Sequence, residues 1–404
     1  MKQQMGDKLK NFFEDYIKKD PIFLDKKALQ SNYTPKTVPH REKEIQQLAG
    51  ILAPSLRMEK CSNVFIYGKT GTGKTLCVKH VTENMKAIAE KNNINFRVFY
   101  LNCKLKRVAD TEYRLIAQLA REFGIEVPAT GLPTDEIYKI FLREIDKEGI
   151  TLSLILDEID QLVEKTGDEI LYNLTRINSE LKNSEVSLIG ISNDLVFTDN
   201  LDPRVKSSLS EEELVFSPYN ALQLQKILWQ RAKLAFKEGV VGDGVIEKCA
   251  AYAAREHGDA RRALELLRVS GELVERDNKT KIIEEYLDKA EEKIERDRVL
   301  DIVSTQPKQF KLTLYSIFNC VKGNDSVFTG EIYDFYKDVC LKTGTKPLTQ
   351  RRVGDIIAEL DMLGIINANV ISKGRYGRTR QIGLAIPSST VPKVAIILKE
   401  GLNL

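Results

Sequence analysis

Several features that would place a chain in a particular protein class are missing from this 404-residue sequence. None of its six cysteines forms a CxxC pair, which argues against a zinc ribbon or a dithiol redox site. No apolar run approaches the roughly 18–20 residues of a membrane-spanning helix, so we expect no membrane partner. The first residues carry mixed charge rather than an apolar signal core, so we expect a cytoplasmic protein with free thiols.

The composition is typical of an ordinary folded protein. Hydrophobic residues make up 42% of the chain and charged residues 29%, which allows buried cores and is unlike a disordered chain. At about 100–200 residues per domain, the length predicts two to four domains.

The net charge of +3 conceals an uneven distribution of charged residues. From Leu300 to the end there are 14 Lys and Arg against 9 Asp and Glu, whereas the preceding part has 47 against 49. A positive excess confined to one terminal part is typical of nucleic-acid binding, although surface charge also serves solubility.

Short apolar runs alternate with helical patterns in the first half of the chain. The runs lie at 64–67, 96–101, 152–156 and 186–191. Runs of this kind, buried on both faces, predict an α/β fold with a parallel sheet covered by helices on both sides. After Pro218 the pattern is wholly helical. Its segments begin at 222 and continue over 245–255, 259–273 and a highly charged stretch at 279–299.

The strongest motif is a phosphate-binding loop of the form GxxxxGK[ST]. It consists of Gly68, Lys69, Thr70, Gly71, Thr72, Gly73, Lys74 and Thr75. It follows the apolar run at 64–67 and opens a predicted helix at Leu76, which is the context that the motif requires. Backbone amides of such a loop and the helix N terminus favour phosphate. We expect Lys74 to hold the β- and γ-phosphates and Thr75 to ligate Mg²⁺.

Two carboxylates, Asp157 and Glu158, follow the apolar run at 152–156. Carboxylates at the end of a buried strand are costly unless a cation lies nearby. Asp157 is suited to an outer-sphere role toward Mg²⁺ and Glu158 to polarising the attacking water. With the loop, they predict ATP and ADP binding and a slow hydrolysis, although an intact glutamate does not by itself establish turnover.

Three more polar residues are candidates for contact with a nucleotide. Asn193 follows the fourth run, where it would orient water or sense the γ-phosphate, or simply form a turn. Arg261 lies in the first turn of a helix, where a cation opposes the helix dipole and needs another partner such as a γ-phosphate. Arg204 would reach the nucleotide of a neighbouring subunit. The alternative for both arginines is an exposed side chain in loose salt bridges.

The last hundred residues predict a winged helix, with helices at 307–321, 329–343 and 348–363 and then a basic hairpin. The third helix has apolar residues at i, i+3, i+4 and i+7, which leaves a polar opposite face for the major groove. The hairpin at 372–380 has four cations and no acid, which suits backbone or minor-groove contacts. A protein-binding winged helix is the alternative. The candidate DNA contacts are Gln350, Arg351, Lys373, Arg375, Tyr376, Arg378 and Arg380.

Together these motifs resemble those of AAA+ ATPases, and more narrowly those of the archaeal origin recognition complex subunit one / cell division control protein six family of replication initiators. The segments that narrow the resemblance are YTP at 33–35, HRE at 40–42, PRVKSSL at 203–209 and GDARRALELL at 258–267. The resemblance covers nearly the whole chain, from about residue 20 to the last residues of the winged helix.

The resemblance implies roles for residues that the motifs alone do not explain. It places four residues near the adenine, namely Val38, Pro39, His40 and Arg41. It makes Asn193 and Arg261 the two nucleotide sensors. It also implies that the segment 104–122 is an insertion that touches DNA, in which Lys104, Lys106 and Arg107 would contact phosphates.

The expected architecture is a tail at 1–20, an AAA+ nucleotide-binding domain at 21–216, a helical lid with linker helix at 217–298 and a winged-helix domain at 299–404. We expect a chromosome-associated initiator that binds origin duplex DNA, switches with ATP and ADP, and works with paralogous initiators and the replicative helicase. One alternative is an AAA+ ATPase in transcription control or protein interaction. Another is a clamp-loader-like subunit, which would need a C-terminal oligomerisation collar.

Overall fold

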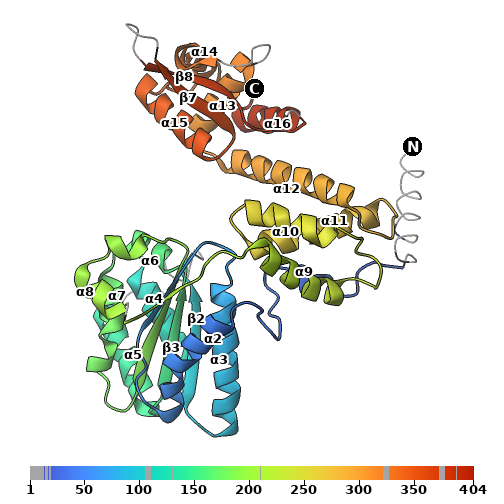
Figure 1. Cartoon of the computed structure of the whole chain (residues 1–404). Coiled ribbons are helices and arrows are strands. Elements are labelled where there is room, and N and C mark those ends of the chain that lie inside the picture. The colour runs from blue at the N-terminus through green and yellow to red at the C-terminus, as the bar shows by residue number, and fades with distance from the viewer. Residues whose placement is uncertain are drawn as a thin grey trace. The chain divides into compact units, whose positions relative to one another are not determined.

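The computed structural model describes Phe13, Ile17 and residues 20–104, 111–128, 132–209, 211–321, 327–372, 378–387 and 389–404. It divides into two compact units, Met1–Leu287 and Asp288–Leu404. The labels in Figure 1 are used for the helices and strands of each unit.

The first unit is built on a five-stranded parallel sheet with the order β2-β3-β4-β1-β5. Its strands are β1 (Val64–Tyr67), β2 (Phe96–Asn102), β3 (Thr151–Asp157), β4 (Glu185–Ser192) and β5 (Glu212–Val215). The predicted parallel sheet is therefore confirmed. Strand β5 was not predicted, because this edge strand buries only Leu214 and has no apolar run.

Helices cover both faces of the sheet (Figure 1). One face packs on α2 (Glu42–Leu52) and α3 (Lys74–Lys91). The other packs on α4 (Glu112–Glu122), α5 (Thr134–Glu148), α6 (Ile159–Thr166), α7 (Glu169–Thr175) and α8 (Pro203–Leu209). Strand β3 joins both cores, with Leu154 on the side of α5 and Ile155 on the side of α3. A strand buried on both faces needs a continuous apolar run, which is why the sequence predicted this strand.

The strand register brings polar residues together at the carboxyl edge of the sheet. Asn102 of β2 is opposite Asp157 of β3, and Tyr67 of β1 is opposite Ser192 of β4. The loops that follow β1, β3 and β4 therefore meet at one edge, where ligands bind in open parallel sheets.

Three helices form a lid after β5, namely α9 (Ala221–Ala235), α10 (Val245–Arg255) and α11 (Ala260–Arg276). Asn220 begins α9 with a capping box. The Asn220 side chain accepts a hydrogen bond from the backbone amide of Gln223, and the Gln223 side chain accepts one from the backbone amide of Asn220. Asp259 caps α11 by accepting from the amides of Arg261 and Arg262. The chain's single tryptophan, Trp229, lies half-exposed on α9.

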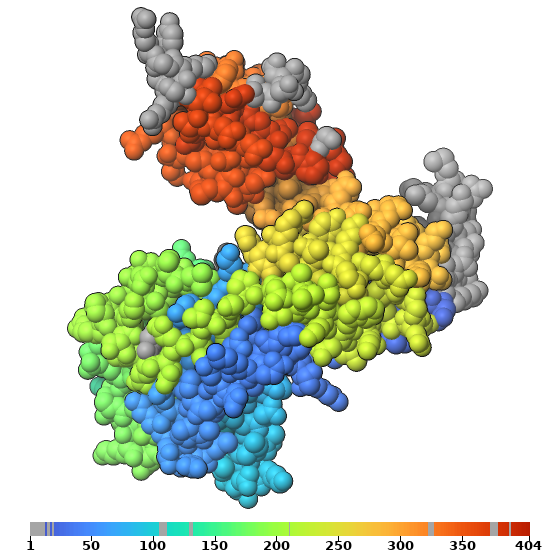
Figure 2. All heavy atoms as spheres, viewed as in Figure 1, coloured from blue at the N-terminus to red at the C-terminus, as the bar shows by residue number. Residues whose placement is uncertain are grey.

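The segment that precedes α2 packs on the lid. The rings of Phe23 and Phe236 lie 4.7 Å apart between centroids, and the amide of Leu24 donates to the carbonyl of Ala235 at 2.8 Å. A Cβ atom at Gly271 of α11 would lie 2.6 Å from Phe23 Cζ, so the ring packs directly on the helix backbone. The expected boundaries assign this segment to the nucleotide-binding domain, whereas Figure 2 shows its dark-blue atoms beside the yellow lid.

The second unit is a winged helix, as expected. It contains α13 (Lys308–Val321), α14 (Thr329–Lys342), α15 (Gln350–Met362) and α16 (Val391–Leu402), with β6 (Val327–Phe328), β7 (Ile366–Ser372) and β8 (Arg378–Leu384) in an antiparallel sheet of order β6-β8-β7. The three predicted helices and the hairpin strands are confirmed. Strand β6 and helix α16 were not predicted. The charged stretch predicted as a helix at 279–299 overlaps α12 (Glu284–Thr305), which begins and ends later in the sequence.

None of the six cysteines is part of a disulfide bond in the structure. Among the described residues, none of the helices combines the length and apolar content that crossing a bilayer requires.

The packing of Phe23 on the lid can be tested with its neighbour as the matched control. Phe23→Ala should lower the free energy of unfolding of the lid by about 3–5 kcal/mol, because it leaves a cavity against Phe236. Leu24 is 63% exposed, so Leu24→Ala should change it by less than about 0.5 kcal/mol. Urea unfolding followed by the fluorescence of Trp229 measures both. Equal effects would contradict the packing.

Candidate functional site

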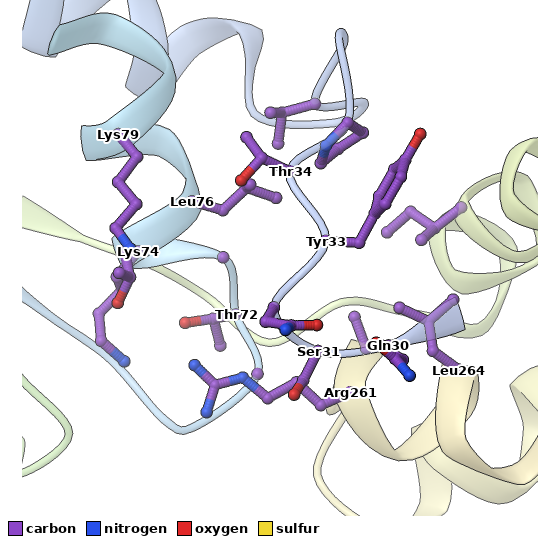
Figure 3. A pocket seen from close by; sticks show the side chains of 18 of the residues that line it. Gln30, Ser31, Tyr33, Thr34, Thr72, Lys74, Leu76, Lys79, Arg261 and Leu264 are labelled. Carbon is purple, nitrogen blue, oxygen red and sulfur yellow. The ribbon is translucent and has the colours of Figure 1, made fainter. Parts of the chain in front are cut away.

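A cavity of about 350 Å³ lies between the carboxyl edge of the sheet and the lid. The segment 30–39, the loop after β1 and helices α9 and α11 line it (Figure 3). The predicted site residues in its lining are Val38, Pro39, Gly71, Thr72, Gly73, Lys74, Thr75, Leu76, Asp157, Glu158, Asn193 and Arg261. The predicted residues outside its lining are His40, Arg41, Gly68, Lys69, Thr70 and Arg204.

Lys74, at the start of α3, has a buried ammonium group. Its Nζ donates to the carbonyl oxygens of Gly68 at 2.6 Å and Lys69 at 2.9 Å, and to Asn193 Oδ1 at 2.9 Å. All three acceptors are uncharged. Burial lowers the pKa of Lys74 to about 8, with Asp157 opposing that shift and Arg261 adding to it. A buried cation with neutral partners is suited to an anionic ligand.

Asp157, at the end of β3, is 6% exposed and lies beside Thr75. Its Oδ2 accepts a hydrogen bond from Thr75 Oγ1 at 2.9 Å and another from the Tyr100 hydroxyl at 2.6 Å. Burial and the bond to Asp157 both raise the pKa of Tyr100. The hydroxyl of Thr75 and the carboxylate of Asp157 are hard oxygen ligands of the kind Mg²⁺ prefers, so this pair fits the predicted metal.

Glu158 has a left-handed backbone, with φ of 55°, at the start of α6. Such a conformation is strained for a residue with a side chain and is often found at functional sites. Its carboxylate lies 3.6 Å from Lys104 Nζ. Lys104, the predicted DNA contact, is thus within reach of the predicted water-polarising residue. Lys106 and Arg107 lie outside the described residues, and the DNA role of all three stays a prediction.

The two predicted sensors reach the same cavity. Asn193 does so through its bond to Lys74, and Arg261 lines the cavity from the first turn of α11. Figure 3 shows the Arg261 side chain extending from the lid toward the loop near Thr72. Their role as sensors stays a prediction.

Arg41 lies behind the loop. It is 4% exposed, its Nε donates to the carbonyl of Thr72 at 3.0 Å and its Nη2 to that of Ser217 at 2.5 Å. Its guanidinium lies 4.2 Å from the centre of the Tyr219 ring. Arg41 therefore joins the loop to the segment that leads into the lid. The neighbouring His40 has φ of 62°, and its amide donates to Glu42 Oε1.

Arg204 lies on the exposed side of α8. Its Nε and Nη2 donate to the Asp202 carboxylate at 3.0 and 3.1 Å, and this ion pair raises the pKa of Arg204. The structure does not bring Arg204 to the cavity of its own chain. Its action on a neighbouring subunit stays a prediction.

Sequence reasoning missed part of the cavity lining that comes from the lid. Arg231 on α9 is 7% exposed, donates from Nη2 to the carbonyl of Tyr33 at 3.3 Å and lies 4.5 Å from the centre of that ring. Burial lowers the pKa of Arg231. Ile227 and Leu264 complete the apolar side of this end. The helical periodicity of α9 identifies its buried face, but no pattern says that this face meets residues 30–39.

The candidate DNA contacts of the second unit divide into two groups. Gln350 and Arg351 are exposed in the first turn of α15. Arg380 is half-buried, and its Nη1 donates to the carbonyl of Gly354 at 2.6 Å, so it ties β8 to α15. Lys373, Arg375 and Tyr376 lie outside the described residues, as does the side chain of Arg378.

Comparison with known proteins gives consistent matches along the chain. Family models match residues 57–197 ("AAA domain"), 225–292 ("Cdc6 AAA+ ATPase-type lid domain") and 301–394 ("CDC6, C terminal winged helix domain"). The ORC1-type DNA replication protein of Thermococcus kodakarensis is 53% identical over 393 residues, which covers 96% of this chain and 94% of that protein. The chain belongs to the ORC1-type DNA replication proteins.

Other members of the ORC1-type family are similarly close. ORC1-type DNA replication protein 1 of Archaeoglobus fulgidus is 51% identical over 383 residues, covering 95% of this chain and 93% of its own length. The solved Orc1 protein of Aeropyrum pernix, in complex with DNA, is 45% identical with a TM-score of 0.83, and the match covers 95% of this chain and 98% of that one. The ORC1-type assignment confirms the predicted family and fold, and its AAA domain implies nucleotide binding.

The pKa of Lys74 makes nucleotide affinity depend on pH. As pH rises through about 8, the unliganded ammonium loses its proton, whereas phosphate favours the charged form. Affinity should therefore fall above that pH, approaching about tenfold per pH unit, with net proton uptake on binding. Calorimetric titration in buffers of different ionisation enthalpy measures this uptake. A Lys74→Met control should show none in this range, and unchanged uptake in that variant would contradict the assignment.

Proposed function

We propose that this chain is a DNA replication initiator whose first unit binds ATP or ADP with Mg²⁺ and whose winged helix binds origin duplex DNA. The observation that carries the nucleotide part is the buried ammonium of Lys74, facing the same cavity as Asp157 and Arg261. The name of the family supports the role in replication.

Phosphates would lie against the amides of the loop and the N terminus of α3, with Lys74 on their oxygens. Thr75 and Asp157 would hold Mg²⁺, which supplies charge neutralisation of the phosphates when bound. Val38, Pro39 and the apolar lining from the lid would receive the base.

Slow hydrolysis would depend on Glu158, which would orient the attacking water while Asn193 and Arg261 respond to the γ-phosphate. Lys104 Nζ lies 3.6 Å from Glu158 Oε2, and a carboxylate has further acceptor sites with which Glu158 would accept a hydrogen bond from water. A slow enzyme of this kind acts as a switch between nucleotide states.

DNA binding would use the first turn of α15 in the major groove and the basic hairpin on the backbone. The exposure of Gln350 and Arg351 supports this placement, and so does the similarity to the Aeropyrum pernix Orc1 protein, which was solved in complex with DNA. Paralogous initiators and the replicative helicase are proposed as further partners, on the chromosome in the cytoplasm. The alternative of transcription control is not favoured, because the relatives that align with nearly the whole chain are named as replication proteins.

Two substitutions separate nucleotide binding from hydrolysis. Lys74→Ala should weaken ATP binding by roughly 10- to 100-fold, since it removes a charge-assisted contact worth about 1.5–3 kcal/mol. Glu158→Gln should retain ATP binding and lower the rate of phosphate release by about 10²-fold or more. Calorimetric titration and a phosphate-release assay measure these quantities. If Lys74→Ala binds ATP as the unmodified chain does, the nucleotide assignment fails.

The DNA interface is tested by the salt dependence of duplex binding. Arg351→Ala with Arg375→Ala should weaken binding and lower the salt slope by about 0.9 for each phosphate contact that is lost. Arg380 stays intact, because it ties β8 to α15. The control is Lys393→Ala with Lys399→Ala, two exposed cations of α16. An unchanged slope in the first variant, or the same decrease in the control, would rule out this interface.

A further inference from the structure

The lid touches the phosphate-binding loop at Gly71. The amide of Ala260, the first residue of α11, donates to the Gly71 carbonyl at 3.2 Å. The carboxylate of Asp259 lies against the same glycine, because a Cβ atom at position 71 would be 1.7 Å from Asp259 Oδ1 and 2.1 Å from its Cγ. No side chain fits at position 71 while the lid is in this place.

Both sides of this contact are fixed by their own surroundings. Gly71 has φ of +70°, within the loop that Arg41 holds through Thr72. Asp259 Oδ1 accepts from the amide of Arg261 at 2.7 Å, which caps α11. The carboxylate therefore cannot turn away from Gly71 without losing the hydrogen bond that caps the helix.

The GxxxxGK[ST] pattern does not by itself specify a glycine at this position. It requires glycine at the places of Gly68 and Gly73, whereas position 71 is one of the four variable residues between them. The left-handed φ of Gly71 favours glycine, and the approach of Asp259 requires it.

We propose that Gly71 is a positioning residue that docks the lid on the phosphate-binding loop and so holds Arg261 over the cavity. Arg261 follows Asp259 by two residues in the same helical turn, so a displacement of Asp259 moves it as well. The effect on nucleotide affinity rests on the proposed function, whereas the contact of Ala260 with Gly71 involves no nucleotide and can be measured without one.

The first experiment compares Gly71→Ala with Gly239→Ala. Gly239 has φ of +79° and open space where its Cβ would lie. Alanine at position 239 therefore strains the backbone as alanine at position 71 does, but it clashes with no neighbouring atom. Hydrogen exchange of the nucleotide-free chain should show the Ala260 amide at least about tenfold less protected in Gly71→Ala, because its bond to Gly71 is lost. Protection unchanged in Gly71→Ala, or equally lost in Gly239→Ala, would overturn the proposal.

The second experiment tests the clash by rescue. Glycine is tolerated at helix N-caps, so Asp259→Gly removes every side-chain atom that meets position 71 while α11 can still begin at this place. Combined with Gly71→Ala, it should restore most of the protection of Ala260 and most of the ATP affinity. Asp259→Asn, which has the size of aspartate, should restore neither. Equal rescue by both would overturn the proposal.

A third comparison separates the docking from direct phosphate contact. The ATP affinity of Gly71→Ala should fall by a factor close to that of Arg261→Ala, and the double variant should fall little further, because one change acts through the other. Additive losses would overturn the proposal. If the unmodified chain binds no ATP while Ala260 exchanges as expected, the docking stands and the proposed function fails.

Discussion

The site depends on the three hydrogen bonds that the buried ammonium group of Lys74 donates. Removing a cation from water is costly, and its partners here are neutral oxygens of Gly68, Lys69 and Asn193. Those partners come from the loop after β1 and from the residue after β4, so they meet only because parallel strands β1 and β4 are neighbours. The helices on both faces of the sheet keep β1 and β4 in this arrangement. They exclude water from the strands, so that only the carboxyl ends of the strands carry polar groups.

The parts of the fold that sequence reasoning predicted are those with a local cause. Strand β3 needs a continuous apolar run because helices cover both of its faces, and helix α15 shows its buried side through Val353 and Ile357 at a helical spacing. The edge strand β5 escaped prediction because it buries little. The same holds for the candidate site. The loop and Asp157 follow from one stretch of chain each, whereas the pairing of Lys104 with Glu158 depends on two segments meeting in space.

Of the residues that the resemblance alone places near the adenine, some line the cavity and others do not. Val38 and Pro39 line the cavity, but Arg41, from the same short segment, is directed at the carbonyls of Thr72 and Ser217. Nothing in the local sequence shows that the Arg41 side chain points away from the cavity. One of its acceptors, the carbonyl of Ser217, lies 176 positions further along the chain. Arg231 escaped prediction for the converse reason, since a buried arginine on a helix face is recognisable only once its partner, Tyr33, is known.

The packing of residues 22–29 on the lid has a mechanical consequence. The chain passes between lid and sheet twice, once through residues 30–41 and once through 216–220, so the lid is attached to the sheet at two points. Once the contact of Ala260 with Gly71 is broken, these two connections would restrict the lid to rotation about the line that joins them. Because residues of the segment 30–39 also line the cavity, a rotation of the lid would change the shape of the cavity at the same time.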